Sequence, residues 1–168
     1  AGQQSRAFAM FERALELSDN VVLTRAALEF AITTLCETGQ AQAAQPMLDR
    51  LRREHGGEGP GRYLQASVHI QLEQWDEALA CLDGITDYND NFTSFREDSV
   101  WTHRAIAHRA LGRPVQAADA AAEALLHNDQ TVGAWQILFE CSDSDEPVRR
   151  VAETIPSERL IPLFAPLT

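Results

Sequence analysis

The sequence predicts an all-α fold, an α-solenoid in which pairs of helices follow one another along the chain. Similar residues recur at a fixed distance: Trp135 follows Trp101 by 34 residues, and Ala78 follows Ala44 by the same interval. A period of that length is typical of stacked helical hairpins. Apolar residues also recur at every third or fourth position, as on one face of a helix, and no alternating or β-branched run predicts a strand.

The period divides the chain into about three full repeats with additional segments at both ends. The predicted segments of this single domain, residues 1–168, are an unpaired N-terminal helix in 1–20, repeats in 21–56, 57–92 and 97–129, and a partial repeat with a C-terminal cap in 130–168. About five extra residues separate the second and third repeats. Equivalent positions hold Leu28, Arg62 and Trp101; Ile32, Ala66 and Ala105; Ala44, Ala78 and Ala117; and, at the break between the two helices, Gly39, Glu73 and Gly112.

The alanines at Ala44, Ala78 and Ala117 predict places where two helices cross closely, because only a small side chain fits there. The change Ala117→Leu should therefore cost about 1–3 kcal/mol through overpacking. Pro114 follows the break at Gly112, as expected of a residue in the first turn of a helix. Pro46 falls inside the second helix of the first repeat, where we expect it to kink the helix or delay its start.

The second helices carry a resemblance to a known family. The segments "GQAQAAQPMLDRL", "EQWDEALACLDGI" and "GRPVQAADAAAEAL" are similar to the second helix of the tetratricopeptide repeat. The first helices match less well: two have the tryptophan of the family, the Leu-Gly pair is absent, and Gly56, Asp90 and Asp129 replace the closing proline. The resemblance covers residues 3–141 and implies a right-handed superhelix whose first helices line a concave groove.

In the resembled family this groove binds an extended peptide or a helix of a partner protein. The resemblance assigns the following residues to the peptide-binding groove: Glu29, Thr33, Cys36, Glu37, Tyr63, Ser67, Ile70, Gln71, Thr102, Ile106, Arg109, Gln136 and Glu140. The branch that binds chaperone tails grips a carboxylate with lysine and asparagine in these columns. Those residue types are missing here, so we do not expect a receptor for chaperone tails.

Two functions from different classes follow as expectations. The first is a non-enzymatic scaffold that binds a protein or peptide partner in the groove. The second is an accessory or oligomerisation domain of a larger enzyme or sensor, such as a bacterial glycosyltransferase with appended repeats. In either case a homodimer could form through the terminal helices. No nucleotide-binding glycine motif or nucleophile elbow is present, and we expect neither catalysis nor a cofactor.

The composition indicates which classes of partner and which cellular compartment to expect. The chain has 14 basic and 25 acidic residues, a net charge of −11, which disfavours binding to nucleic acid or to anionic membranes. No run of 18 apolar residues predicts a transmembrane helix. Cys36, Cys81 and Cys141 form no CxxC pair and indicate free thiols in a reducing compartment. We therefore predict a cytoplasmic protein without a bound metal.

The segment "WTHRAIAHRALGRP" is a cluster of polar residues with two interpretations. His103 and His108 are five positions apart, about 140° around a helix, so they cannot share one metal ion. His108 also occupies the same column as His69 and Leu35, which indicates a packing position. Arg109 could pair with an acidic partner residue; the alternative, which we favour, is a solvated face with ion pairs between residues four positions apart.

Three weaker motifs have structural interpretations. Asp87, Asn89, Asn91 and Asp98 are spaced as in a calcium loop, but the required glycine is replaced by Phe92 and the last ligand is Asp instead of Glu. Asn91-Phe92-Thr93 is a glycosylation acceptor only in a secretory pathway. Asp143-Ser144-Asp145 has the Asp-x-Asp spacing of glycosyltransferases, but without a predicted strand it is better interpreted as a helix cap.

The two ends of the chain are predicted to differ from the repeats. "RAFAMFERALELSDN" matches a second helix that has no first helix before it, which indicates that the chain belongs to a longer protein. At the other end we predict two short helices, one beginning at Ser144 or Asp145 and one at Ser157. Their apolar residues should cap the last repeat, whose helices have no following neighbour.

Overall fold

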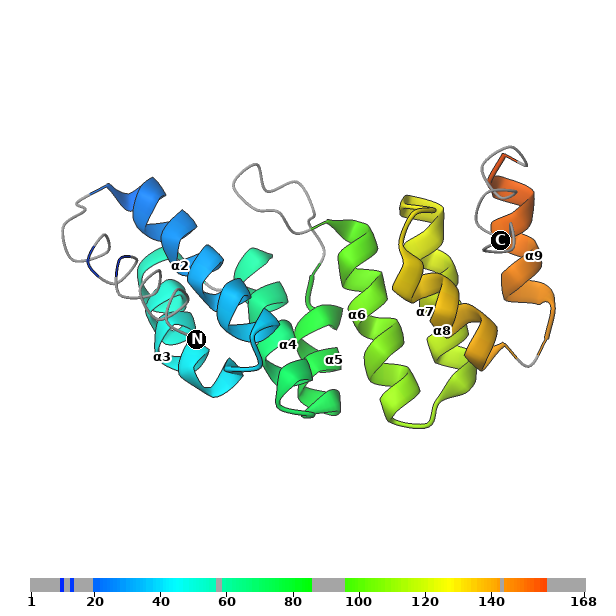
Figure 1. Ribbon diagram of the computed structural model, residues 1–168, viewed down its shortest axis with the longest axis horizontal. Coiled ribbons are helices and arrows are strands. Elements are labelled where there is room, and N and C mark those ends of the chain that lie inside the picture. Colours follow the sequence, from blue (N-terminus) through cyan, green and yellow to red (C-terminus); the bar gives the residue numbers. More distant parts are fainter. Residues whose placement is uncertain are drawn as a thin grey trace, which may run out of the picture. The chain divides into compact units, whose positions relative to one another are not determined.

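The computed structural model describes Met10, Arg13 and residues 20–56, 59–85, 96–142 and 144–156 (Figure 1). Within these residues every regular element is an α-helix and no strand is present, which confirms the predicted all-α class. The chain divides into two compact units, residues 1–95 and 96–168. The unpaired helix predicted in residues 1–20, the extra segment before the third repeat and the last short helix lie largely outside the described residues.

The first unit contains four described helices. They are α2 (Val21–Glu37), α3 (Ala41–His55), α4 (Pro60–Gln71) and α5 (Trp75–Asp83). Each packs against the next along the chain, and α2 also contacts α4. One buried apolar cluster of this unit, from α2, α3 and α4, consists of Cys36 and of residues with 5% exposure or less: Leu28, Ile32, Leu35, Ala41, Ala44, Leu48, Leu51, Leu64 and Val68.

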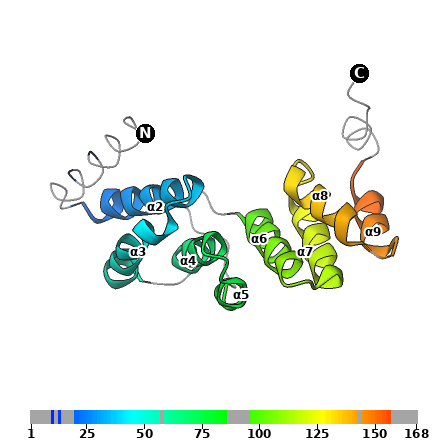
Figure 2. The ribbon, with the colours of Figure 1, turned by 60° about the horizontal axis from the view of Figure 1, so that its bottom comes forward.

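The second unit contains the other four described helices. They are α6 (Glu97–Ala110), α7 (Pro114–His127), α8 (Val132–Cys141) and α9 (Glu146–Thr154). Here α7 packs between α6 and α8, α6 also contacts α8, and α9 packs mainly on α7 (Figure 2). The core is built largely from alanines of α7 with Ile137 and Leu138 of α8 and Val151 and Ile155 from the C-terminal part.

Three helical hairpins in the described part of the chain turn in the same way. The residue that follows the helix cap has a positive φ in each: 70° at Gly39, 58° at Glu73 and 67° at Gly112. Two backbone N–H groups in each turn donate to carbonyls of the last helical turn, as in a Schellman motif. The bonds run from Gly39 to Cys36 and Gln40 to Leu35, from Glu73 to Ile70 and Gln74 to His69, and from Gly112 to Arg109 and Arg113 to His108. A helix therefore ends and another begins at each of the three predicted breaks.

The alanines of the repeated columns lie where helices meet. Ala44, Ala78 and Ala117 are fully buried, and so are Ala66 and Ala105 on the first helices. A methyl group lets two helix backbones approach closely, and packing at interior density leaves no room for a longer side chain. The recurrence of alanine in the sequence therefore has a direct cause in the packing of each hairpin.

Local sequence signals explain where the helices begin. The side-chain oxygen of Asn20 accepts hydrogen bonds from the N–H groups of Val22 and Leu23 and so caps α2. Pro60 and Pro114 occupy the first helical position, where a missing N–H has no cost. The expected delay at Pro46 is wrong, because α3 begins at Ala41 and continues through the proline. Pro46 is exposed, so the carbonyl that loses its donor four residues earlier can be hydrated.

Polar side-chain contacts join α6 to the α7–α8 loop and α9 to α7 in the second unit. The buried carboxylate of Asp98, at the start of α6, accepts hydrogen bonds from Asn128 at 2.9 Å and Thr131 at 3.4 Å in the α7–α8 loop. At the other end, Arg150 of α9 contacts Glu123 of α7 at 3.3 Å. Asp98, a candidate calcium ligand by its spacing, thus serves to join two parts of the fold, while the other residues of that motif lie outside the described residues.

Candidate functional site

The residues assigned to a groove lie on α2 and α4 in the first unit and on α6 and α8 in the second. In the first unit, Glu29, Cys36 and Ile70 are buried, with 9%, 6% and 9% exposure. Glu37 and Gln71 are exposed, and the remaining three residues of this set are partly buried: Thr33, Tyr63 and Ser67. Glu29 accepts a hydrogen bond from Arg25 at 2.8 Å within α2, so its charge is already paired.

The serine and threonine hydroxyl groups of the predicted groove donate their protons to main-chain carbonyls of their own helices. Thr33 donates to the carbonyl of Glu29 at 2.9 Å, and Ser67 donates to that of Tyr63 at 3.0 Å. In the second unit Thr102 donates to the carbonyl of Asp98 at 2.7 Å. A hydroxyl oxygen has two lone pairs, so each of these groups can still accept a hydrogen bond from a ligand.

Three of the predicted residues meet across α6 and α8. Nη1 of Arg109, on α6, donates to Oε2 of Glu140 at 2.8 Å, and Nε2 of Gln136 donates to Oε1 of Glu140 at 2.7 Å. The hydrogen bonds from Gln136 and from Arg109 lower the pKa of Glu140 below its ordinary value. The half-buried Ile106 lies on α6 and packs against the core of this unit. We call Thr102, Ile106, Arg109, Gln136 and Glu140 the α6–α8 face.

The arginines of "WTHRAIAHRALGRP" do not form one cluster. The guanidinium of Arg104 lies over the ring of Trp101, 4.3 Å from its centroid, in the geometry of a cation–π contact. Arg113 is exposed at the cap of α7. The favoured interpretation, ion pairs between residues four positions apart on one helix, does not apply to Arg109, because its partner Glu140 lies 31 positions away on another helix.

The two histidines of the same segment, His103 and His108, take part in contacts within α6 and the turn that follows it. Nδ1 of His103 donates to the carbonyl of Ser99 at 2.8 Å, and burial lowers the pKa of this imidazole. The main-chain carbonyl of His108 accepts the turn hydrogen bond from Arg113. Within the described residues no group of three or more His, Cys, Asp or Glu side chains is arranged to hold a metal ion.

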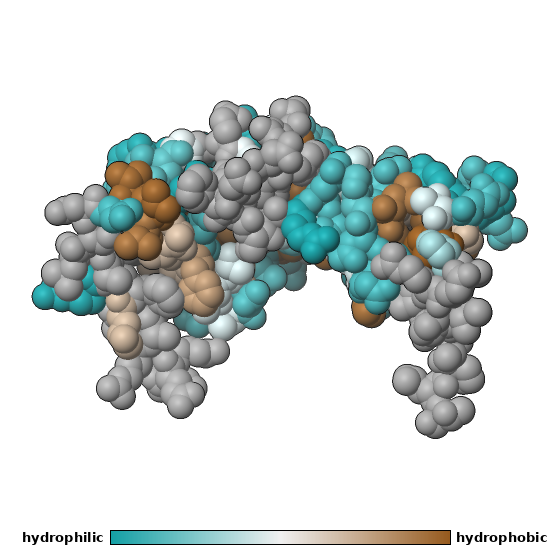
Figure 3. Space-filling view, turned by 90° about the horizontal axis from the view of Figure 1, so that it is seen from above, coloured by the Kyte–Doolittle hydropathy of each residue, from teal (hydrophilic) through white to brown (hydrophobic). Residues whose placement is uncertain are grey.

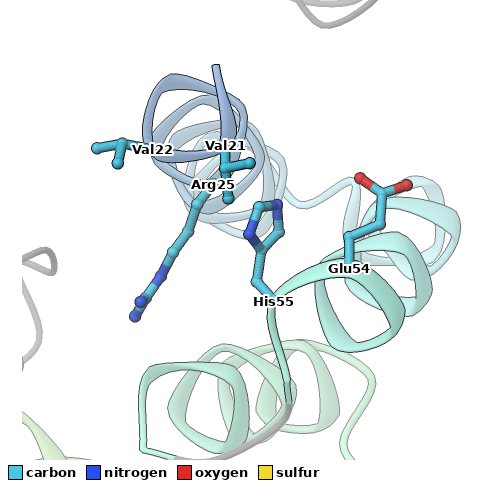
Figure 4. A pocket seen from close by; sticks show the side chains of 5 residues that line it. All are labelled: Val21, Val22, Arg25, Glu54 and His55. Carbon is cyan, nitrogen blue, oxygen red and sulfur yellow. The ribbon is translucent and has the colours of Figure 1, made fainter. Parts of the chain in front are cut away.

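A cavity of about 320 Å³ lies between the start of α2 and the end of α3, and none of the predicted groove residues lines it (Figure 4). It is lined by Val21, Val22, Arg25, Glu54 and His55. Figure 4 shows the guanidinium of Arg25 and the carboxylate of Glu54 pointing away from each other on either side of the His55 ring. Both charged groups are already paired, with Glu29 and Arg50. Their charges do not converge on one point in the cavity.

The thiols have no sign of reactivity. Cys36 and Cys141 are buried and Cys81 is partly buried, and none of them is in a disulfide. Burial, with a smaller contribution from the charge of Glu37, raises the pKa of Cys36 to about 11. Burial also raises the pKa of Cys81, against the opposing effect of Arg62 and Arg52. Since the thiolate is the nucleophilic form, the raised pKa values disfavour Cys36 and Cys81 as nucleophiles at neutral pH.

Exposed apolar side chains form a feature that the groove assignment missed. On α8, Val132 and Phe139 are 74% and 51% exposed, and Phe139 stacks on Trp135 with ring centroids 5.7 Å apart. Seven positions separate Val132 from Phe139, and Gln136 lies between them on the same side of the helix. The helical period of the sequence could have identified this stripe, but the groove columns of the resembled family do not include these two residues.

Comparisons of the chain with models of protein families, with curated proteins and with solved structures find no match. Among the described residues, no helix combines the length and the apolar character that crossing a membrane requires.

Proposed function

We propose that this protein is a non-enzymatic scaffold of the tetratricopeptide type. In this proposal the helix pairs form a right-handed α-solenoid, and its first helices line a concave groove that binds an extended peptide or a helix of a partner protein. The observation that carries the proposal is the recurrence of one hairpin. In α2–α3, α4–α5 and α6–α7 the same turn, with its positive φ and paired hydrogen bonds, is followed by a buried alanine in the second helix.

The α6–α8 face adds support from side chains. Arg109 was assigned to the groove from the third repeat, and Gln136 and Glu140 from the partial repeat that follows it; Glu140 accepts a hydrogen bond from each of the other two. First helices of consecutive repeats would line the same face of a solenoid, so contact between these side chains is what the proposal requires.

Site-specific photo-crosslinking would test the proposal. A benzophenone side chain is introduced at Ser67 or Gln136, in the predicted groove, and at the exposed Gln42 or Val115, on second helices, as matched controls. We expect both groove positions to give an adduct of the same partner, and the control positions to give none. The adduct should disappear when Tyr63→Ala and Arg109→Glu are combined. Equal adducts from all four positions would contradict a groove.

A second candidate is self-association, as expected of an accessory domain. Figure 3 shows hydrophobic surface in the first unit, and the exposed apolar side chains at the start of α2 are Val21, Val22 and Leu23, at 66%, 50% and 61% exposure. Exposed apolar residues close together in space favour protein contacts. Light scattering should show a dimer that Leu23→Asp converts to a monomer, whereas Val115→Asp on α7 does not. A monomer at all concentrations argues against this candidate.

A further inference from the structure

The charged groups of the α6–α8 face are paired with each other, which favours a ligand without charge. The only two charges on this face, those of Arg109 and Glu140, are paired with each other at 2.8 Å. Both oxygens of the Glu140 carboxylate already accept a hydrogen bond, one from Arg109 and one from Gln136. The face therefore presents no uncompensated charge to attract an acidic or a basic ligand.

The same bonds determine which groups remain for a ligand. Arg109 has five N–H donors, and among the described residues only Glu140 receives a hydrogen bond from it. Gln136 spends an amide N–H on Glu140, which leaves its carbonyl oxygen as an acceptor. The hydroxyl group of Thr102 donates its proton to the main-chain carbonyl of Asp98, so toward a ligand its oxygen can only accept. The α6–α8 face thus has unused N–H donors on Arg109 and unused oxygen acceptors on Gln136 and Thr102.

An extended peptide has the complementary pattern in its main chain. Its carbonyl and N–H groups alternate along each edge, and main-chain hydrogen bonds supply affinity whatever the side chains are. The half-buried Ile106 between these polar groups offers an apolar surface to one ligand side chain. The carboxylate of Glu140 holds Arg109 and Gln136 in place, which reduces the side-chain entropy lost on binding.

We propose that the α6–α8 face binds the main chain of an extended, uncharged peptide segment, with Arg109 donating to a peptide carbonyl and Gln136 accepting from a peptide N–H. This inference rests on the proposed groove function and specifies the chemistry of its ligand. It differs from recognition of an acidic side chain by Arg109, which would require that arginine to act as a charge.

The test uses the full chain and three sets of synthetic decapeptides with acetylated and amidated ends. One set is neutral and rich in Ser, Thr, Leu and Ile, one is acidic, and one is basic. Binding is measured by fluorescence polarisation at 50 and 300 mM salt. We expect members of the neutral set to bind, with a change in Kd of less than about twofold between the two salt concentrations, since no net charge is neutralised.

N-methylation of alternate backbone amides should then weaken the neutral peptides by tenfold or more. The variant Gln136→Ala should weaken them by about fivefold to twentyfold, in line with loss of one hydrogen bond. Gln116→Ala on the exposed side of α7 is the matched control and should leave Kd unchanged. Circular dichroism of each variant establishes that its fold is retained.

The alternative outcomes separate this inference from the proposed function. If the acidic or the basic set binds instead, and binding depends on Arg109 and falls with salt, the groove exists but recognises charge, and the inference is overturned. Equal binding of the N-methylated peptides would also overturn it, because side chains would then supply the affinity. If no set binds, the inference is overturned, and the photo-crosslinking experiment alone decides the proposed groove function, which includes a helical partner.

Discussion

Arg109 on α6 and Glu140 on α8 form an ion pair with 2.8 Å between Nη1 and Oε2. Both side chains are partly exposed to solvent, at 41% and 47%. An exposed pair of this kind contributes little to stability, because solvent screens the charges and two long side chains must be held in one conformation. The contact therefore orients the side chains of the α6–α8 face more than it stabilises the unit.

The first prediction follows from this exposure. Arg109→Ala should lower the free energy of unfolding by less than about 1 kcal/mol, as measured by urea denaturation. The binding measurements described above should change much more for the same variant. A loss of several kcal/mol would show that the pair has a structural role, and would remove Arg109 from the list of ligand-contacting residues.

The second prediction concerns the turn between α4 and α5. Glu73 has a φ of 58°, whereas the equivalent turns have glycine at Gly39 and Gly112. A side chain with a Cβ is strained in this region, by about 1 kcal/mol or more. Glu73→Gly should therefore raise the free energy of unfolding by about 0.5–1 kcal/mol, despite the greater entropy of glycine in the unfolded chain.

The matched control is Gly112→Ala in the equivalent turn between α6 and α7. It places a Cβ at a φ of 67° and should destabilise the protein by about 1 kcal/mol, although no atom lies within 4 Å of the added carbon. Thermal and urea unfolding of the two variants would measure both changes. Destabilisation by Glu73→Gly would mean that the carboxylate of Glu73 matters more than the backbone strain.

The third prediction tests the close crossings of helices with two adjacent residues of α3. Ala44 is fully buried and Ala43 is exposed. Ala44→Leu should destabilise the protein by about 1–3 kcal/mol through overpacking, and Ala117→Leu should do the same in the second unit. Ala43→Leu adds the same side chain to the same helix and should change stability by less than about 0.5 kcal/mol. Equal effects at the two positions would contradict the packing described for α3.

The fourth prediction compares two tryptophans of the same repeat column. Nε1 of Trp135 donates to the carbonyl of Asp129 at 2.8 Å in the α7–α8 loop, whereas Nε1 of Trp101 is buried and makes no hydrogen bond within the described residues. Trp135→Phe leaves a buried carbonyl without its donor and should cost about 1–3 kcal/mol beyond the lost volume. Trp101→Phe removes a donor that has no acceptor and should cost less. Urea denaturation would rank the two.

The fifth prediction concerns pH and the buried thiol of Cys36. Its pKa is about 11 in the folded protein against 9.0 as the ordinary value, so between these two pH values the unfolded chain releases a proton that the folded chain retains. Stability from this group is therefore complete below pH 9 and is lost as the pH rises toward 11. Cys36→Ala should flatten this decline in urea unfolding measured between pH 8.5 and 11. An unchanged slope would show that Cys36 does not titrate there.

The sequence alone determined the helical class, the positions of the hairpins and the alanines at their crossings. These features depend on local physical rules: the 3.6-residue period of apolar side chains, the backbone conformation required after a helix cap, and the small volume available where helices meet. That is why the spacing of residues in the sequence is sufficient to identify the column that holds Gly39, Glu73 and Gly112. The expected delay at Pro46 was wrong because its exposure in α3, a tertiary property, decides how much a missing N–H costs.

Only the tertiary structure decided which side chains meet. Arg109 and Glu140 are 31 positions apart, and Asn128 reaches Asp98 across 30 positions, distances over which no local pattern carries information. The packing of α6 against α7 and α8 brings them together, and the sequence favoured a different pairing for Arg109. The fold also decided which side chains are buried, and it removes Cys36 and Ile70 from the surface. Within "WTHRAIAHRALGRP" it gives the histidines and arginines separate contacts, such as those of His103 with Ser99 and of Arg104 with Trp101.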